Sequence, residues 1–298
     1  MGDGTSATRE ERIGIRKMYK LFINGAFVRS ESGRSTPLWN GKEFQANIAQ
    51  ASRKDLRNAV TAARSAQIRW WAMDPQLRGL TIYRLGEMLE ARRSEYIDAL
   101  AASTEGDARS ARDEVDAAID RVVWYAGWCD KYSALLSSNN PVAGPHFNCS
   151  TPEPMGVVAM LAPQTPLFLG ALSVLLPALV AGNAVILLAS ERDPRPAIAL
   201  AEAVALSDIP PGVVNVLSGH RSEIAPAMAK HDGIEAIAAP REDLERWNEI
   251  ERESAASIKR IRAFPVRRAQ EYFGERAQSL DAIADFCEIK TIWHPVGF

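Results

Sequence analysis

Apolar residues in the middle of the chain fall into blocks whose lengths alternate between those of strands and those of helices. Three short apolar runs cover 157–161, 184–188 and 213–217, and two helix-length stretches, 167–181 and 195–205, separate them. Uninterrupted runs of this length are typical of strands buried on both faces, as in a parallel sheet. The pattern predicts a β-α-β-α-β unit with right-handed crossovers, and therefore an α/β fold.

The ends of these strands are the places to look for a site. Ligands of open parallel sheets bind beyond the carboxyl ends of the strands. With a fourth strand expected over 234–238, the stretches of interest follow Leu161, Leu188, Leu217 and Ile237.

A membrane span is the other interpretation of the central apolar block, because 166–182 approaches the length that a bilayer requires. However, Pro163, Pro166, Pro177 and the Gly182-Asn183 pair divide the block into strand-sized and helix-sized pieces. The flanks also lack the Lys/Arg excess that orients a spanning helix. The sequence therefore favours a sheet with crossover helices.

The segments before the central unit show turn and helix signals. Asn24-Gly25 between two apolar triplets predicts a hairpin over 21–28. Ser52 with Asp55 three residues later resembles a capping box, which starts a helix that runs to about Gln67. Two long amphipathic helices are expected over 76–103 and 108–136, lying against the sheet, with the aromatic residues of the second (Trp124, Tyr125 and Trp128) in the core.

The segments after the central unit become more charged. A short helix is expected over 220–230, and a charged helix over 241–262 follows the fourth strand. The charges of this helix are interpreted as a solvated, ion-paired face. Trp247 and Ile250 on it need an apolar surface, and we expect contact with the basic connection 265–278 or with a partner. A half-turn of helix over 280–286 and a final strand over 287–293 complete the chain.

Composition narrows the class of protein. The 298 residues are 47% hydrophobic and 24% charged, with a net charge of −2 and a pI near 6.2, so the chain lacks the basic excess of nucleic-acid and membrane-surface binders. Cys129, Cys149 and Cys287 are odd in number and far apart, which predicts reduced thiols in the cytoplasm. The four histidines show no metal-ligand spacing, so no metal is expected. Residues 1–19 are interpreted as a flexible tail without a signal peptide.

Several motifs together resemble the aldehyde dehydrogenase superfamily. In chain order they are LFINGAFV, AVTAARSA, YRLGEMLEARRSEY, WYAGWCDKY, EPMGVV, PALVAGNAVIL, IPPGVVNVLSG and FCEIKTIW. The resemblance covers about 20–261 and 280–293, and the catalytic domain that the family carries between these blocks is missing. It implies a Rossmann-like cofactor-type domain over 20–262, a connection over 263–279, and oligomerisation strands over 141–153 and 280–298.

The resemblance also implies which catalytic groups to look for. The family uses a cysteine nucleophile, a glutamate base, an asparagine in the oxyanion hole and a nicotinamide cofactor. None of the three cysteines stands in a nucleophile-like context. The glutamate position falls on Phe264, which cannot accept a proton, and the asparagine position falls on Thr165. We therefore expect no catalytic residues in this chain.

Cofactor-binding positions are degraded as well. The family's K-x-x-E, whose Lys and Glu hold the adenosine ribose, corresponds to Leu188 and Glu191, and its Gly-Ser at the pyrophosphate corresponds to Arg241 and Glu242. Pro240 ahead of them removes one N–H, and Glu242 places an anion where a phosphate would bind, which Arg241 offsets in part. Glu191, Thr165 and Arg241 thus remain as a degenerate candidate site for NAD or NADP, and a cap on the following helix is the other role for Glu191.

The retained strands suggest a function. In the family the two oligomerisation segments form an arm that packs on the catalytic domain of a neighbouring subunit, and this chain keeps the arm but not its receptor. The leading hypothesis is a non-catalytic subunit that forms a hetero-oligomer with a full-length NAD(P)-dependent aldehyde dehydrogenase, as the resemblance to the degenerate second half of two-domain members implies. The alternative is a stand-alone NAD(P)-binding protein or oxidoreductase, and a decaying remnant is the third interpretation.

Overall fold

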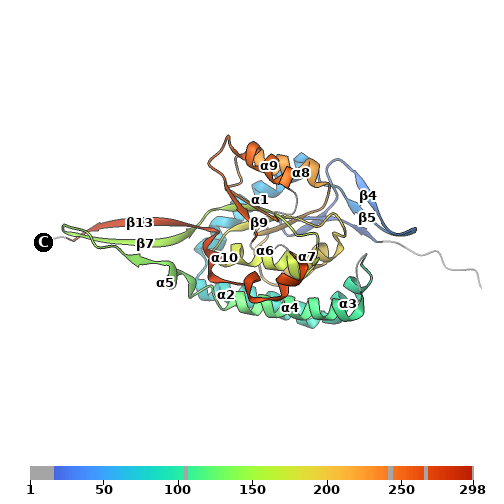
Figure 1. Ribbon diagram of the computed structural model, residues 1–298, viewed down its shortest axis with the longest axis horizontal. Coiled ribbons are helices and arrows are strands. Elements are labelled where there is room, and N and C mark those ends of the chain that lie inside the picture. The colour runs from blue at the N-terminus through green and yellow to red at the C-terminus, as the bar shows by residue number, and fades with distance from the viewer. Residues whose placement is uncertain (1–16, 104–106, 241–243, 265–267, 297–298) are drawn as a thin grey trace, which may run out of the picture.

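The computed structural model describes residues 17–103, 107–240, 244–264 and 268–296. A layered α/β body carries a long two-stranded arm at one end and a short hairpin at the other (Figure 1). The hairpin consists of β4 (Ser35–Asn40) and β5 (Glu43–Ala49), with β1 (Met18–Tyr19) added in parallel beside β5. Sequence patterning missed these three strands. Of the predicted tail 1–19, residues 1–16 lie outside the described residues.

The body is built on a seven-stranded sheet with the order β12-β11-β8-β9-β10-β2-β3. Its strands are β12 (Arg260–Ala263), β11 (Ala236–Ala239), β8 (Val157–Leu161), β9 (Ala184–Leu188), β10 (Val214–Leu217), β2 (Leu21–Ile23) and β3 (Ala26–Val28). The first five pair in parallel, and the β2-β3 hairpin adds antiparallel to β10. The predicted β-α-β-α-β unit, the fourth strand and the Asn24-Gly25 hairpin are confirmed.

Helices cover both faces of the sheet, as the unbroken apolar strands require (Figure 1). One face carries α1 (Arg53–Ala72), α8 (Arg221–Lys230) and α9 (Leu244–Ser254). The other carries α2 (Pro75–Ala91), α3 (Arg93–Ala101), α4 (Ala108–Ala126), α6 (Leu169–Val180), α7 (Arg195–Leu206) and α10 (Leu280–Ala284). Alternate residues of each strand enter two separate apolar clusters: Val158 and Met160 lie in the first, and Val157 and Ala159 in the second. The central strands β8, β9, β10 and β11 therefore have two buried faces, whereas the edge strands β12 and β3 are only partly buried.

Local signals in the first half are confirmed. Ser52 is the N-cap of α1, and Ser52 and Asp55 form the reciprocal capping box. Tyr125 is fully buried in the first cluster, against which Trp124 and Trp128 pack.

The helix expected over 76–103 is instead two helices, α2 and α3, that meet at Arg92. The helix expected over 108–136 ends at Ala126, and α5 (Tyr132–Leu136) follows separately.

The charged helix expected over 241–262 is wrong at its carboxyl end. The helix α9 ends at Ser254, and 260–263 return as the strand β12 beside β11. The Lys259 ammonium group donates to the carbonyls of His231 and Ile234, and the Arg260 N–H donates to Glu235, so this stretch has partners that a continued helix would lose. Trp247 and Ile250 are buried in the second cluster with residues of α8, an apolar surface that the prediction of the connection or a partner did not include.

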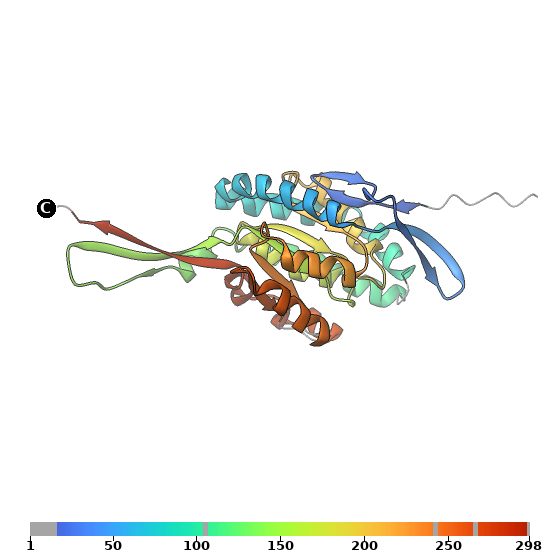
Figure 2. The same ribbon diagram turned by 90° about the horizontal axis from the view of Figure 1, so that it is seen from above.

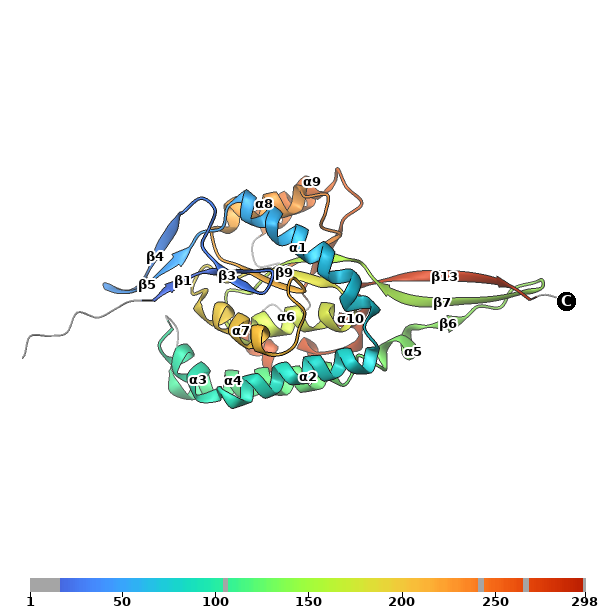
Figure 3. The ribbon, with the colours of Figure 1, turned by 180° about the vertical axis from the view of Figure 1, so that it is seen from behind.

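The arm consists of β7 (His146–Pro154) and β13 (Cys287–Pro295), with the two-residue β6 (Ser138–Asn139) on the far side of β7. The ladder runs antiparallel from Cys287 opposite Pro154 to Pro295 opposite His146. The arm extends away from the body in the view from above (Figure 2), and seen from behind it lies opposite the β4-β5 hairpin (Figure 3).

Candidate functional site

The loops that follow β8 and β9 are joined by the side chain of Gln164. Its carboxamide oxygen accepts the hydroxyl of Ser190 at 2.7 Å, the N–H of Glu191 at 3.1 Å and that of Arg192 at 3.4 Å. Ser190 is buried, whereas Glu191 and Arg192 are exposed. One amide oxygen thus accepts hydrogen bonds from three groups where the loops after β8 and β9 meet.

The loops after β9 and β10 are joined by Glu191. Its carboxylate accepts the backbone N–H of Arg221, the first residue of α8, at 2.8 Å, and His220 Nδ1 lies 3.6 Å from the same oxygen. The side chain of Arg221 is only 7% exposed and donates to the carbonyl of Ala162 directly after β8. The three strand ends are therefore cross-linked by the chain's own side chains.

Glu191 therefore caps a helix, but not the helix expected from the sequence. The N-terminus of α7 is occupied by Asp193, which accepts the N–H of Arg195 at 3.0 Å and pairs with its guanidinium at 2.6 Å. Asp193 lies only two residues before Arg195, so its carboxylate easily reaches the N–H of Arg195. Glu191 instead caps α8, the helix that follows β10.

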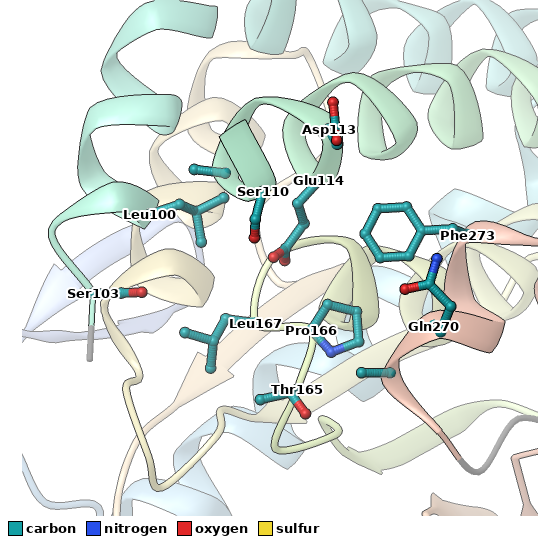
Figure 4. Close-up of a pocket in the computed structure, with 12 residues that line it drawn as sticks. Leu100, Ser103, Ser110, Asp113, Glu114, Thr165, Pro166, Leu167, Gln270 and Phe273 are labelled. Atoms are coloured by element: carbon teal, nitrogen blue, oxygen red, sulfur yellow. The ribbon is translucent and has the colours of Figure 1, made fainter. Parts of the chain in front are cut away.

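Thr165 lies in a different place, a cavity of about 330 Å³ at the N-terminus of α6 (Figure 4). There Glu114 of α4 accepts the N–H groups of Phe168 and Leu169 at 2.6 and 3.0 Å. Burial raises the pKa of the Glu114 carboxyl, and these two hydrogen bonds oppose the rise. Thr165, Ser110 and Gln270 share this cavity with Glu114.

Two of the three predicted cofactor residues, Glu191 and Thr165, line different cavities. Glu191 lines a smaller cavity of about 110 Å³ with Gly219 and His220, whereas Thr165 lines the cavity beside Glu114. Arg241 lies outside the described residues. Gln164 and Arg221 join the loops at the strand ends, and sequence reasoning missed both.

The cysteines and Phe264 have the surroundings of structural residues. Burial raises the pKa of the Cys129 thiol to about 11 and that of Cys287 to about 12, so both are protonated at neutral pH. Cys149 is half-buried within β7 of the arm. Phe264, the residue that the resemblance predicts at the family's glutamate position, is buried in the first cluster.

The connecting segment, residues 268–279, is packed on the body by Arg121 of α4. The Arg121 guanidinium donates to the carbonyls of Tyr272 and Ala277 at 2.7 and 2.8 Å and to the side chains of Gln278 and Ser173 at 2.8 and 2.7 Å. Arg121 is 3% exposed, and desolvation lowers its pKa. The sequence did contain a signal for it, because Arg121 falls at helical spacing among the buried residues Ala118 and Tyr125.

The described residues offer neither a metal centre nor a membrane-spanning helix. No group of three or more His, Cys, Asp or Glu side chains there could hold a metal ion. In the same part of the chain, no helix is long and apolar enough to cross a membrane.

The chain has a largely parallel sheet with helices on both faces and with loops that meet at the carboxyl ends of the strands. This architecture is the dinucleotide-binding type of α/β fold. The chain belongs to the aldehyde dehydrogenase family, whose model matches residues 28–240.

Similar proteins agree with this assignment. Human retinal dehydrogenase 2 is 32% identical over 231 residues, covering 74% of this chain and 43% of that protein. The mitochondrial aldehyde dehydrogenase of Rattus norvegicus is 31% identical over 227 residues, covering 74% and 43%. Among solved structures, the NAD+ complex of the Bacillus cereus aldehyde dehydrogenase matches with a TM-score of 0.77 at 28% identity, covering 82% of this chain and 50% of that one. The chain spans about half the length of the curated relatives it matches.

Proposed function

We propose that this chain is a non-catalytic subunit that assembles with a full-length NAD(P)-dependent aldehyde dehydrogenase by docking its arm on that partner. The observation that carries the proposal is the arm itself, which extends from the body (Figure 2). Large apolar side chains of the arm are exposed. Ile289 and Trp293 of β13 are each 60% exposed, and Phe147 of β7 is 49% exposed.

Both faces of the arm present apolar groups. Side chains alternate along a strand, so Ile289 and Trp293 lie on one face. Ile292 and Phe147 lie on the other face. Phe147 is paired with His294 and therefore shares its face, and His294 is two residues from Ile292 on the same strand. Burying the exposed half of each of these four side chains is worth on the order of 1 kcal/mol each before the costs of association. A partner groove that encloses the arm would gain from both faces.

The arm is attached to the body by defined contacts. At the base of the arm, Arg260 of the body strand β12 pairs with Glu288 of β13 at 2.9 Å. Within the arm, Lys290 of β13 pairs with Glu153 of β7 at 3.0 Å. In the described residues β13 has a neighbour on one side only, so its other edge offers backbone N–H and C=O groups for strand pairing. Such a fixed, open edge suits recognition by strand addition.

The surroundings of the candidate catalytic residues support a role without chemistry of its own. The buried thiols have raised pKa values, and the resemblance predicts the buried Phe264 at the family's glutamate position. An assembly role requires no dinucleotide on this chain. The alternative, a stand-alone NAD(P)-binding protein, is favoured by the retained sheet and by the NAD+ complex of the Bacillus cereus relative. Calorimetric titration with NAD and NADP separates the two roles.

Co-expression tests the proposal. The chain is co-expressed with each full-length aldehyde dehydrogenase of its own genome, purified through a tag on this chain, and sized by light scattering. We expect one partner to co-elute. The arm variant Trp293→Ser should release it, whereas Trp39→Ser should not, because Trp39 is similarly exposed (52%) but lies on the hairpin at the other end of the body. A monodisperse monomer in the presence of every such enzyme would contradict the proposal.

A further inference from the structure

Helices α2 and α4 lie side by side on the outer side of the body, across the sheet from α1, α8 and α9 (Figure 3). Four large apolar side chains on these two helices are between 45% and 59% exposed, namely Leu77, Leu80, Tyr83 and Val123. The first three are spaced three residues apart, so they form one stripe along α2. We call the four residues the α2-α4 face. A contiguous apolar surface of this kind marks a site of protein interaction.

A groove of about 330 Å³ runs between the two helices, and all residues of the α2-α4 face except Leu77 line it. The helices approach closely beside the groove, because a Cβ at Gly79 would lie only 2.9 Å from the carbonyl oxygen of Ala126. Further along α2, a Cβ at Gly86 would lie 3.5 Å from Val122. Residue numbers therefore rise along α2 as they fall along α4, so the two helices run antiparallel.

Charged side chains stand at both ends of the α2-α4 face. Asp130 and Lys131 line the groove together with Pro75, at the end where α2 begins. Arg84 and Glu87 are exposed towards the other end of α2. Each end thus carries one acid and one base around an apolar centre.

This distribution of charges is complementary to itself. Consider a second copy of the chain turned by 180° about an axis that passes through Leu80 and is perpendicular to α2. Leu80 then meets Leu80 of the second copy, and each end of the face meets the opposite end of its mate. Arg84 comes opposite Asp130 and Glu87 opposite Lys131, and the symmetry produces each pair twice. A second copy therefore fits both the apolar centre and the charged ends.

The size of the α2-α4 face indicates how strong such a contact would be. Side chains of this size that are about half exposed present on the order of 100 Å² each. Two copies would then bury roughly 800 Å² at the apolar centre, about half of a standard interface, before the charged ends are counted. An interface of this size gives a dimer that forms at micromolar concentrations of the chain.

We propose that the chain self-associates through the α2-α4 face into a two-fold dimer with a Kd of about 1–100 μM. The α2-α4 face belongs to the body and is separate from the arm (Figure 3). The dimer therefore does not depend on the proposed docking of the arm. Where both contacts form, the assembly contains two copies of this chain.

Sedimentation equilibrium of the full chain alone, from about 1 to 200 μM, tests the dimer. We expect a monomer–dimer equilibrium. Leu80→Asp should raise the Kd more than about tenfold, because a carboxylate enters the apolar centre from both copies. Ile258→Asp is the matched control, since Ile258 is fully exposed in the turn after α9, and it should leave the Kd unchanged. Both positions are exposed, so thermal unfolding should show that each variant is folded.

The arm variant Trp293→Ser shows which surface forms the dimer. We expect this variant to dimerise like the wild type, whereas it should lose the full-length partner enzyme in the co-expression experiment. A dimer that is lost in Trp293→Ser and kept in Leu80→Asp would form through the arm and would overturn the inference. A wild-type chain that stays monomeric at all these concentrations would also overturn it, even if the partner enzyme co-elutes.

Charge reversal tests the two-fold arrangement. Glu87→Lys and Lys131→Glu should each raise the Kd about three- to tenfold, because each places like charges opposite one another at two symmetric positions. The double variant Glu87→Lys/Lys131→Glu restores opposite charges and should return the Kd to within about twofold of the wild type. A double variant at least as weak as either single variant would overturn the inference.

Discussion

The side-chain amide of Asn183 donates to the carbonyl of Phe286 at 2.9 Å, although the two residues are far apart in the sequence. The same side chain accepts the N–H of Gly156 at 2.9 Å and is fully buried. Gly156 follows β7 and Phe286 precedes β13, so one asparagine at the start of β9 holds the bases of both arm strands. The direction in which the arm leaves the body therefore depends on this residue.

Replacing Asn183 with Ala should weaken both the body and the base of the arm. The carbonyl of the buried Phe286 and the N–H of the partly buried Gly156 would lose these partners, at up to about 1–3 kcal/mol each. We expect a loss of roughly 2–5 kcal/mol in the free energy of unfolding, measured by urea titration, and faster proteolysis within 286–295. Asn140→Ala is the comparison, because Asn140 bonds only within the arm, to Asn148 and Ser150. An equal loss in both variants would contradict the role given to Asn183.

Arg121 should be required to hold the connecting segment. In Arg121→Met the buried carbonyls of Tyr272 and Ala277 lose their donor, and we expect a destabilisation of about 3–5 kcal/mol. Limited proteolysis should then cut within 268–279 before any other described segment. Arg84→Met serves as control, since Arg84 is exposed on α2 and pairs only with surface carboxylates, and it should change stability by less than about 0.5 kcal/mol. Uncut protein in the Arg121 variant would refute the prediction.

Trp247 should act on folding and not on assembly. Trp247 of α9 is buried against the apolar residues of α8, so Trp247→Ser should destabilise the chain by about 3–5 kcal/mol. Any complex that does form should keep its stoichiometry, which light scattering measures. Loss of the complex in a variant of unchanged stability would show instead that Trp247 faces a partner.

The buried thiols should make the fold sensitive to alkali. The pKa of Cys129 is raised from 9.0 to about 11 and that of Cys287 to about 12, so above pH 9 the unfolded chain loses protons that the folded chain keeps. The free energy of unfolding is therefore constant with respect to these groups below pH 9, and it falls as the pH rises from about 9 towards 11. Urea titrations between pH 7 and pH 10.5 measure this decline.

A variant with both thiols removed provides the control for the alkaline effect. Cys129→Ala/Cys287→Ala should show a shallower decline than the wild type over the same pH range, whatever its stability at pH 7. In the native wild type at pH 8, a thiol reagent should modify Cys149 first, because only this cysteine is part-exposed. A decline of equal slope in both proteins would rule out the thiols as its cause.

Local signals predicted the parts of the fold that depend on neighbours in the sequence. The apolar runs at β8, β9 and β10 and the Ser52–Asp55 capping box are of this kind, because each is decided within a few residues. The charged stretch after α9 was misassigned because its helical pattern is strong, whereas pairing with β11 is a contact that the pattern does not contain. Tertiary pairing overrode propensity there.

The candidate site was less predictable than the fold. Thr165 and Glu191 were named from the sequence, yet they line different cavities, and the groups that join the strand ends were not named. Gln164 and Arg221 are ordinary polar residues in loops, and only the meeting of three strand ends gives them buried partners. Arg121 could have been found, because a charged residue on a buried helix face needs a specific partner.

The pairing of β7 with β13 has a consequence for synthesis. The two strands are adjacent in space, but most of the central sheet lies between them in the sequence. As the chain leaves the ribosome, β7 emerges long before its mate and stays open along that edge until residue 295 has been made. The surface proposed for docking therefore comes into existence only after translation has passed this point, so a partner that recognises the finished ladder cannot bind while β13 is still unmade.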